Sequence, residues 1–131
     1  MKIQKSSEDY LEAMLMMQEQ HGFIRSTDVA GHLGVTKPSV SYATKRLREA
    51  GFITMDRDGL ITLSDSGMEI AQRMYSRHKF LSHALVAIGV SEQTALEDAC
   101  KIEHDISQET FDALQRLALL FLERNGGKSE S

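Results

Sequence analysis

Apolar residues recur at helical spacing along most of the chain, and short breaks separate the resulting segments. Residues 6–21 carry one apolar stripe, with Ser6 or Ser7 as the expected N-terminal cap and Gly22 as the stop. Further helices are predicted over about 26–33, 36–50, 64–88, 91–104 and 108–124. In the long fourth helix the expected apolar stripe consists of Ile70, Met74, Leu81, Leu85 and Ile88. The pattern therefore predicts a mostly α-helical chain.

Residues 26–51 have the spacing of a helix-turn-helix. A short helix capped by Ser26 turns at Gly34, and a second helix begins with Thr36 as cap and Pro38 in its first turn. An ordinary αα-corner with a solvated basic face is the alternative. Residues 52–63 hold two β-rich runs around an Asp-Gly turn, which predicts a β-hairpin. A helix-turn-helix followed by a hairpin is a winged helix, so the hairpin favours DNA binding.

Charge is distributed unevenly along the chain. The total is −4, but residues 36–57 hold five cations and two acids, a net +3, which leaves −7 for the remainder. A basic island on an acidic body is typical of an element that faces phosphates. Short hydroxyls near the start of the second helix can approach bases, and the cations beyond them can meet phosphates. The candidate DNA-binding residues are Thr36, Lys37, Pro38, Ser39, Ser41, Tyr42, Lys45, Arg46 and Arg57.

The rest of the composition bounds the class of protein. A transmembrane helix needs about 20 apolar residues in a row, and the sequence contains no such run. The first residues lack the apolar core of a signal peptide. The single cysteine excludes a disulfide within the chain and fits a reducing compartment. We therefore expect a cytoplasmic protein. The three helices after the hairpin carry more apolar surface than a monomer of this size needs, which predicts a homodimer. The expected domains are a DNA-binding winged helix over 1–66 and a helical dimerisation and metal-binding domain over 67–131.

One short stretch carries candidate metal chemistry. Cys100, Glu103 and His104 stand at i, i+3 and i+4, so a helix would project them from one face. A thiolate, a carboxylate and an imidazole together suit a soft-to-borderline metal ion. The alternative is that Cys100 is a small buried hydrophobe and the other two are solvated. Asp9 and Glu12 also share a helix face, although first-turn acids are common.

In its order of elements and in four motifs, the chain resembles the metal-dependent transcriptional repressors of the diphtheria toxin repressor and manganese transport regulator family. The motifs are Glu-Asp-Tyr-Leu-Glu at 8–12, Val-Thr-Lys-Pro-Ser-Val-Ser at 35–41, Tyr-Ser-Arg-His at 75–78 and Glu-Asp-Ala-Cys-Lys-Ile-Glu-His at 97–104. The resemblance is to the short type that lacks an SH3-like third domain. It implies a repressor of metal-uptake genes that binds a palindromic operator as a dimer and takes a divalent metal as co-repressor.

The resemblance places the metal ligands on Asp9, Glu12, His78, Cys100, Glu103 and His104. Manganese-type members have the two N-terminal acids but a glutamate at the position of Cys100, whereas iron-type members have the cysteine. Fe(II) and Mn(II) both remain open, and Co(II), Zn(II) or Cd(II) are expected to substitute in vitro. Iron-type members also build a second site with an acid and a histidine at two positions that here hold Ser82 and Leu96.

Two other classes of function are alternatives to a metal-dependent repressor. A winged-helix regulator could respond to a small molecule or to oxidation of Cys100 without any metal. A metallohydrolase would need three ligands, an open water position and a separate general base, and the six candidate ligands leave no obvious spare base. We therefore expect that the protein is not an enzyme.

Overall fold

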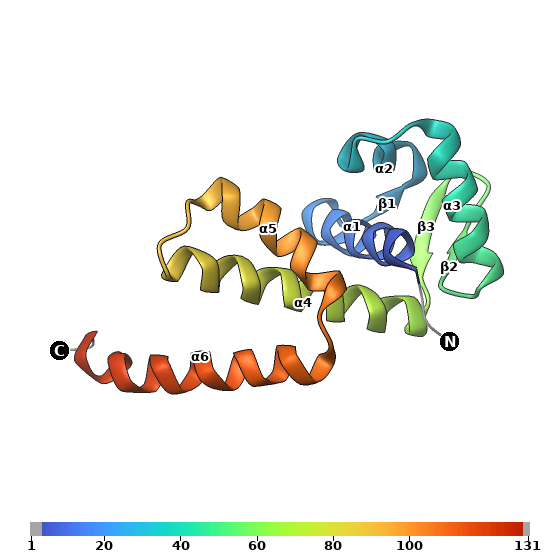
Figure 1. The fold of residues 1–131 in the computed structure, drawn as a ribbon. Coiled ribbons are helices and arrows are strands. Elements are labelled where there is room, and N and C mark those ends of the chain that lie inside the picture. The colour runs from blue at the N-terminus through green and yellow to red at the C-terminus, as the bar shows by residue number, and fades with distance from the viewer. Residues whose placement is uncertain (1–3, 130–131) are drawn as a thin grey trace. The chain divides into compact units, whose positions relative to one another are not determined.

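The structure is a computed structural model that describes residues 4–129, with side chains described as far as residue 121. The chain divides into two compact units, residues 1–76 and 77–131, with the boundary inside the long helix α4. Figure 1 shows the order of the elements, and the predicted fold class is confirmed. The elements are α1 (Lys5–His21), β1 (Ile24–Arg25), α2 (Ser26–Leu33), α3 (Lys37–Glu49), β2 (Ile53–Met55), β3 (Leu60–Leu63), α4 (Asp65–Ala87), α5 (Glu92–Asp105) and α6 (Gln108–Ser129).

The first unit is built around the apolar face of α1. Its buried core joins residues of α1, α2, α3, the sheet and the start of α4: Leu11, Met14, Val29, Leu47, Ile61 and Ala71 are among them. The predicted hairpin is present, with β2 and β3 antiparallel and Thr54 opposite Thr62. A further strand, β1, pairs with the other edge of β3 and gives the sheet order β1-β3-β2. The sequence did not predict β1, because two residues are too short to show an alternating pattern.

The ends of the helices follow the predicted signals in most places. Gly22 and Gly34 close α1 and α2 with positive φ, and Thr36 caps α3 by accepting a hydrogen bond from the Ser39 N–H at 3.2 Å. The caps predicted at the starts of α1 and α2 are wrong. The capping position of α1 is Gln4, and Ser26 lies inside the first turn of α2, where its N–H donates to the Gly59 carbonyl of the hairpin turn.

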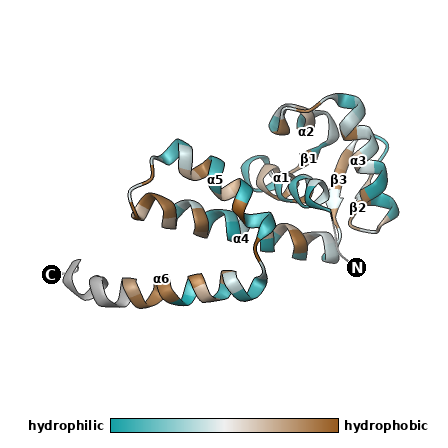
Figure 2. Ribbon diagram, viewed as in Figure 1, coloured by the Kyte–Doolittle hydropathy of each residue, from teal (hydrophilic) through white to brown (hydrophobic). Residues whose placement is uncertain are grey.

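The second unit contains the last part of α4 with α5 and α6. Leu81, Ala99 and Phe111 form its small buried core, and the rings of Phe80 and Phe111 meet edge to face at 5.5 Å. Ile88, predicted to continue the apolar stripe of α4, is 78% exposed because the helix has already ended at Ala87. Figure 2 shows apolar residues along α6, and several of them are exposed: Leu114, Leu117, Leu119, Leu120 and Phe121. Within residues 4–129, none of the helices combines the length and the continuous apolar character that a membrane span requires.

Candidate metal centre and nucleic-acid interface

Helices α4 and α5 bring three of the predicted ligands together within the second unit. The Glu103 side chain is completely buried, and its Oε2 lies 3.0 Å from Nδ1 of His78. Its Oε1 lies 3.3 Å from Nε2 of His104, whose side chain is 1% exposed. One carboxylate thus lies between two imidazoles, one from each helix.

The burial of these side chains decides between the two interpretations of the 100–104 stretch. Cys100 is exposed, whereas Glu103 and the His104 side chain are buried. The alternative of a buried cysteine beside solvated polar residues is therefore wrong on both counts. Burial of a carboxylate away from water is costly unless charged or hydrogen-bonding groups compensate it. A donor set of this kind is typical of a site with a binding function.

The chemistry of this cluster fits a divalent transition metal. Imidazole nitrogens and a carboxylate oxygen are common ligands of Mn(II), Fe(II), Co(II) and Zn(II). An imidazole ligates a metal through a ring nitrogen that carries no proton, and each Glu103 oxygen faces a ring nitrogen of one histidine. Cys100 lies one turn before Glu103 in α5 and is exposed. Its participation stays a prediction.

The other two predicted ligands lie in the first unit, on α1. Asp9 and Glu12 are three residues apart on this helix, and Glu12 is buried. Burial raises the pKa of the nearby Tyr75 phenol, and so do the hydrogen bond to Glu19 and the negative charges of Glu19 and Glu12. Glu12 is thus part of an acidic environment in this unit. The grouping of Asp9 and Glu12 with the ligands of the second unit stays a prediction.

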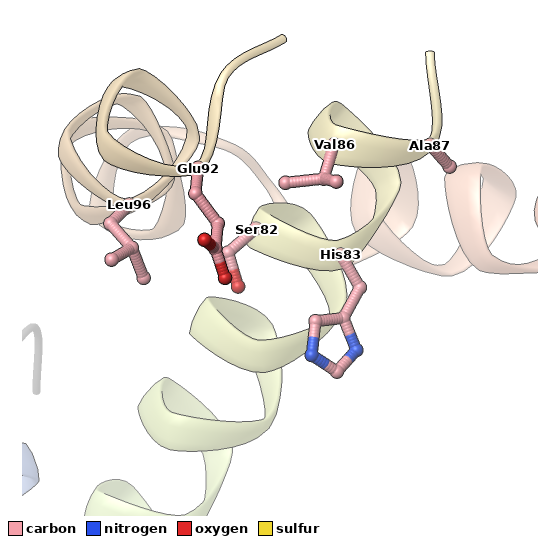
Figure 3. A pocket seen from close by; sticks show the side chains of 6 residues that line it. All are labelled: Ser82, His83, Val86, Ala87, Glu92 and Leu96. Atoms are coloured by element: carbon pink, nitrogen blue, oxygen red, sulfur yellow. The ribbon is translucent and has the colours of Figure 1, made fainter. Parts of the chain in front are cut away.

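The second unit also contains a hollow of about 590 Å³ between α4 and α5 (Figure 3). It is lined by Ser82, His83, Val86, Ala87, Glu92 and Leu96. Ser82 and Leu96 are the two positions at which iron-type members carry an acid and a histidine. Here an alcohol and a hydrocarbon take those places, and the Ser82 hydroxyl already donates to the Lys79 carbonyl at 3.2 Å. The two positions that the resemblance assigns to the iron-type second site therefore offer no carboxylate or imidazole, although His83 and Glu92 line the same hollow.

The candidate DNA-contacting residues lie on the exposed face of α3 and at the turn between β2 and β3. All nine of them are exposed, whereas Val40, Thr44 and Leu47 of α3 face the core. The Arg46 guanidinium lies 5.6 Å from the centre of the Tyr42 ring, a cation–π distance that places both side chains on one surface. Both the Asp58 N–H and the Leu60 N–H donate to Asp56 Oδ1, which holds the shape of the turn that carries Arg57.

The structure also reveals a buried cation that the sequence reasoning missed. Arg77 is 6% exposed, and its guanidinium donates to the Glu103 carbonyl at 2.8 Å and to the Ile106 carbonyl at 3.2 Å. The signal that could have identified it is its position in the apolar stripe of α4, three residues after Met74 and four before Leu81. A charged residue in such a stripe is buried only where partners compensate its charge.

Two family models match successive parts of the chain. Residues 2–60 match the iron dependent repressor, N-terminal DNA binding domain. Residues 64–125 match the iron dependent repressor, metal binding and dimerisation domain. The first match contains α3, β2 and the turn that leads into β3, and the second contains His78, Cys100, Glu103 and His104.

Known proteins with similar sequences and structures agree with these matches. The transcriptional regulator MntR of Salmonella typhimurium is 36% identical over 123 residues, which cover 94% of this chain and 76% of the relative. The HTH-type transcriptional regulator MntR of Bacillus subtilis is 30% identical over 95% of this chain and 88% of its own length. A solved structure of a manganese-dependent transcriptional repressor in complex with manganese superimposes with a TM-score of 0.72 at 27% identity. It covers 92% of this chain and 52% of that one.

Proposed function

Because the chain belongs to the iron-dependent repressor family of metal-responsive, DNA-binding transcriptional regulators, we propose that it represses metal-uptake genes with Fe(II) or Mn(II) as co-repressor. Proteins of this family are regulators and not enzymes. The observation that supports the proposal most directly is the buried Glu103 carboxylate between His78 and His104. This cluster lies in the part of the chain that matches the metal-binding and dimerisation domain.

We propose that six side chains hold the metal: Asp9, Glu12, His78, Cys100, Glu103 and His104. The three carboxylates and the thiolate bring four negative charges per subunit, so they repel one another when no cation is bound. The ion supplies the positive charge that removes this repulsion. Residues 1–66 are then the DNA-binding domain and residues 67–131 the dimerisation and metal-binding domain.

In this mechanism the ligands of the two domains act as a clamp. Asp9 and Glu12 belong to the same domain as α3, whereas the other four ligands belong to the dimerisation domain. Engagement of both sets fixes α3 relative to the dimer, and the two α3 helices then match adjacent major grooves, about 34 Å apart. A nearly complete switch between the two states requires a difference in binding free energy of about 5.5 kcal/mol. Coordination of a metal by several ligands can supply it.

Dimerisation would use the exposed apolar stripe of α6. Leu114, Leu117 and Phe121 stand at i, i+3 and i+7, and Leu117 is 64% exposed. We expect Leu117→Glu to convert a dimer into a monomer in sedimentation velocity, with helix content unchanged. Leu60→Glu, at an exposed leucine of β3, is the matched control and should leave the dimer intact. A dimer that survives Leu117→Glu would contradict this choice of surface.

The two α3 helices of a symmetric dimer would read a palindromic operator, and we infer that the protein acts in the cytoplasm. The decisive experiment is an anaerobic gel-shift titration of the full chain with Fe(II), Mn(II), Co(II) and Zn(II). We expect tight binding to a palindromic operator only with metal, and loss of this response in Glu103→Ala combined with His104→Ala. DNA binding that is equally tight without any metal would refute the proposal. A double variant regulated like the wild type would instead favour a small molecule or Cys100 oxidation as the signal.

The preferred metal depends on Cys100. A thiolate favours softer ions than a carboxylate does, so it favours Fe(II), Co(II) and Zn(II) over Mn(II). We expect Cys100→Glu to shift the order of metal affinities towards Mn(II), and a Cys100→Ser variant controls for loss of the thiol alone. An unchanged order of affinities in Cys100→Glu would show that this residue does not set selectivity.

A further inference from the structure

Two consecutive residues of α4 contact the main chain and the side chain of the same residue in α5. Nδ1 of His78 lies 3.0 Å from Oε2 of Glu103, and Nη1 of Arg77 donates to the Glu103 carbonyl oxygen at 2.8 Å. Consecutive residues of a helix point about 100° apart, so the two contacts hold Glu103 from different directions. Helix α4 therefore contacts both the carboxylate of Glu103, through His78, and the backbone carbonyl of Glu103, through Arg77.

The guanidinium of Arg77 reaches beyond Glu103. It donates to the Ile106 carbonyl at 3.2 Å and, through Nη2, to Oε1 of Gln108 at 2.8 Å. It also lies over the Phe111 ring, 5.3 Å from the ring centre. Because Gln108 and Phe111 belong to α6, a single buried side chain connects α4, the end of α5 and the start of α6.

The end of α5 needs donors of this kind. The last four carbonyls of a helix have no partner within the helix. Gly22 and Gly34 supply a backbone N–H in the left-handed conformation at the ends of α1 and α2. At the end of α5, Ile106 is extended instead, with φ −106° and ψ 151°. A guanidinium there both donates hydrogen bonds and places positive charge at the negative end of the helix dipole.

We propose that Arg77 is a positioning residue of the metal site. It fixes the last turn of α5 in the conformation from which Glu103 and His104 ligate, and it couples that turn to α6. This inference rests on the proposed function, because it assigns Arg77 a role only if Glu103 and His104 bind metal. Side chains that orient metal ligands without touching the metal commonly change affinity by about 10-fold to 100-fold when they are replaced.

The test compares Arg77→Met with Arg73→Met in the full chain, using Co(II) as the probe. Arg73 lies one turn earlier in α4, is 41% exposed, and lies 3.9 Å from Glu8, so it controls for loss of a cation from the same helix. We expect Arg77→Met to weaken Co(II) binding about 10-fold to 100-fold, to alter the visible Co(II) spectrum, and to speed amide exchange over residues 101–106. Arg73→Met should change none of these. Arg77→Lys should recover part of the affinity, because an ammonium cannot reproduce the fork of the guanidinium.

Two further variants separate the possible failures. If Arg77→Met folds and melts at a lower temperature but keeps its Co(II) affinity and spectrum, the role of Arg77 is purely structural and the inference is overturned. If Arg77→Met does not fold, Gln108→Leu removes one acceptor of the guanidinium, and unchanged Co(II) affinity and amide exchange in that variant would overturn it equally. Glu103→Gln tests the metal site itself. If Glu103→Gln leaves Co(II) binding intact, the proposed function fails. If Glu103→Gln loses Co(II) binding but Arg77→Met keeps it, only the role of Arg77 is refuted.

Discussion

Replacement of Gly67 by alanine would place a methyl group against the backbone of Phe52. A Cβ at Gly67 would lie 2.1 Å from the Phe52 carbonyl oxygen and 3.0 Å from its carbonyl carbon. The carbonyl cannot simply turn away, because it accepts a hydrogen bond from the Ser64 N–H at 2.9 Å. The first turn of α4 therefore packs against the base of the hairpin at a distance that only glycine permits.

The expected cost has three parts. Overpacking against a backbone group destabilises by about 1–3 kcal/mol, and a weakened hydrogen bond adds about 1 kcal/mol. Alanine regains about 1 kcal/mol relative to glycine within a helix. The net loss is about 2 kcal/mol, a large change in the ratio of folded to unfolded protein. Gly31 is the matched control, because a Cβ there meets nothing within 4 Å, and Gly31→Ala should stabilise by roughly 0.5–1 kcal/mol.

Urea unfolding followed by far-ultraviolet circular dichroism measures both changes. With a slope of about 2 kcal/mol/M, the midpoint of Gly67→Ala should fall by about 1 M and that of Gly31→Ala should rise by a few tenths. All proteins are compared at one subunit concentration, since dimerisation contributes to the apparent stability. A Gly67→Ala protein as stable as the wild type would refute the close approach of α4 to Phe52.

The remaining predictions concern the DNA surface, a helix cap and alkaline pH. If Arg46 contacts a phosphate in both subunits, Arg46→Gln should reduce the steepness of log DNA affinity against log salt concentration by about 2 per dimer. An unchanged slope would exclude that contact. Ser107→Ala should lower the free energy of unfolding by about 1 kcal/mol, with Ser107→Asp close to wild type, because Ser107 Oγ accepts the Thr110 N–H at 3.1 Å. Burial, followed by the hydrogen bond to Glu19, raises the pKa of Tyr75 above its usual 10.0. The stability from Tyr75 is therefore complete below pH 10 and lost as pH rises through the raised pKa, so urea midpoints of Tyr75→Phe should decline less above pH 10. If the urea midpoints of the wild type and Tyr75→Phe fall equally above pH 10, ionisation of Tyr75 is not the cause of the decline.

Most of the local structure could be predicted from the sequence because its signals lie within a few residues of one another. The spacing of apolar residues and the caps at Thr36, Ser91 and Ser107 set the limits of the helices, and Asp58-Gly59 set the turn of the hairpin. Two of the failures occurred where a distant segment decides the outcome. Strand β1 forms because β3 offers it an edge, and the pairing leads directly into α2, which moves Ser26 from the cap into the helix.

In the candidate site, too, the sequence predicted local relations but not those that depend on distant segments. The i, i+3, i+4 spacing predicted only that Glu103 and His104 would stand close to Cys100 on one helix, and all three do lie in α5. It could not predict that the side chains of Glu103 and His104 are buried while Cys100 is exposed, because this depends on which side of α5 packs against α4. The role of Arg77 was missed for a related reason. Its partners are backbone carbonyls and α6 side chains about 26 to 34 residues away, and backbone carbonyls leave no trace in residue identity.

The exposure of Cys100 gives the protein a natural chemical reporter. It is the sole cysteine of the 131-residue sequence, and it lies in α5 one turn from the buried carboxylate. A thiol-reactive reagent would therefore label one defined position per chain, at a rate set by the thiolate fraction and by access to the sulfur. If the sulfur ligates metal, labelling should slow in proportion to occupancy. The unaltered protein can thus be titrated by its own reactivity, without a spectroscopically active metal or an introduced probe.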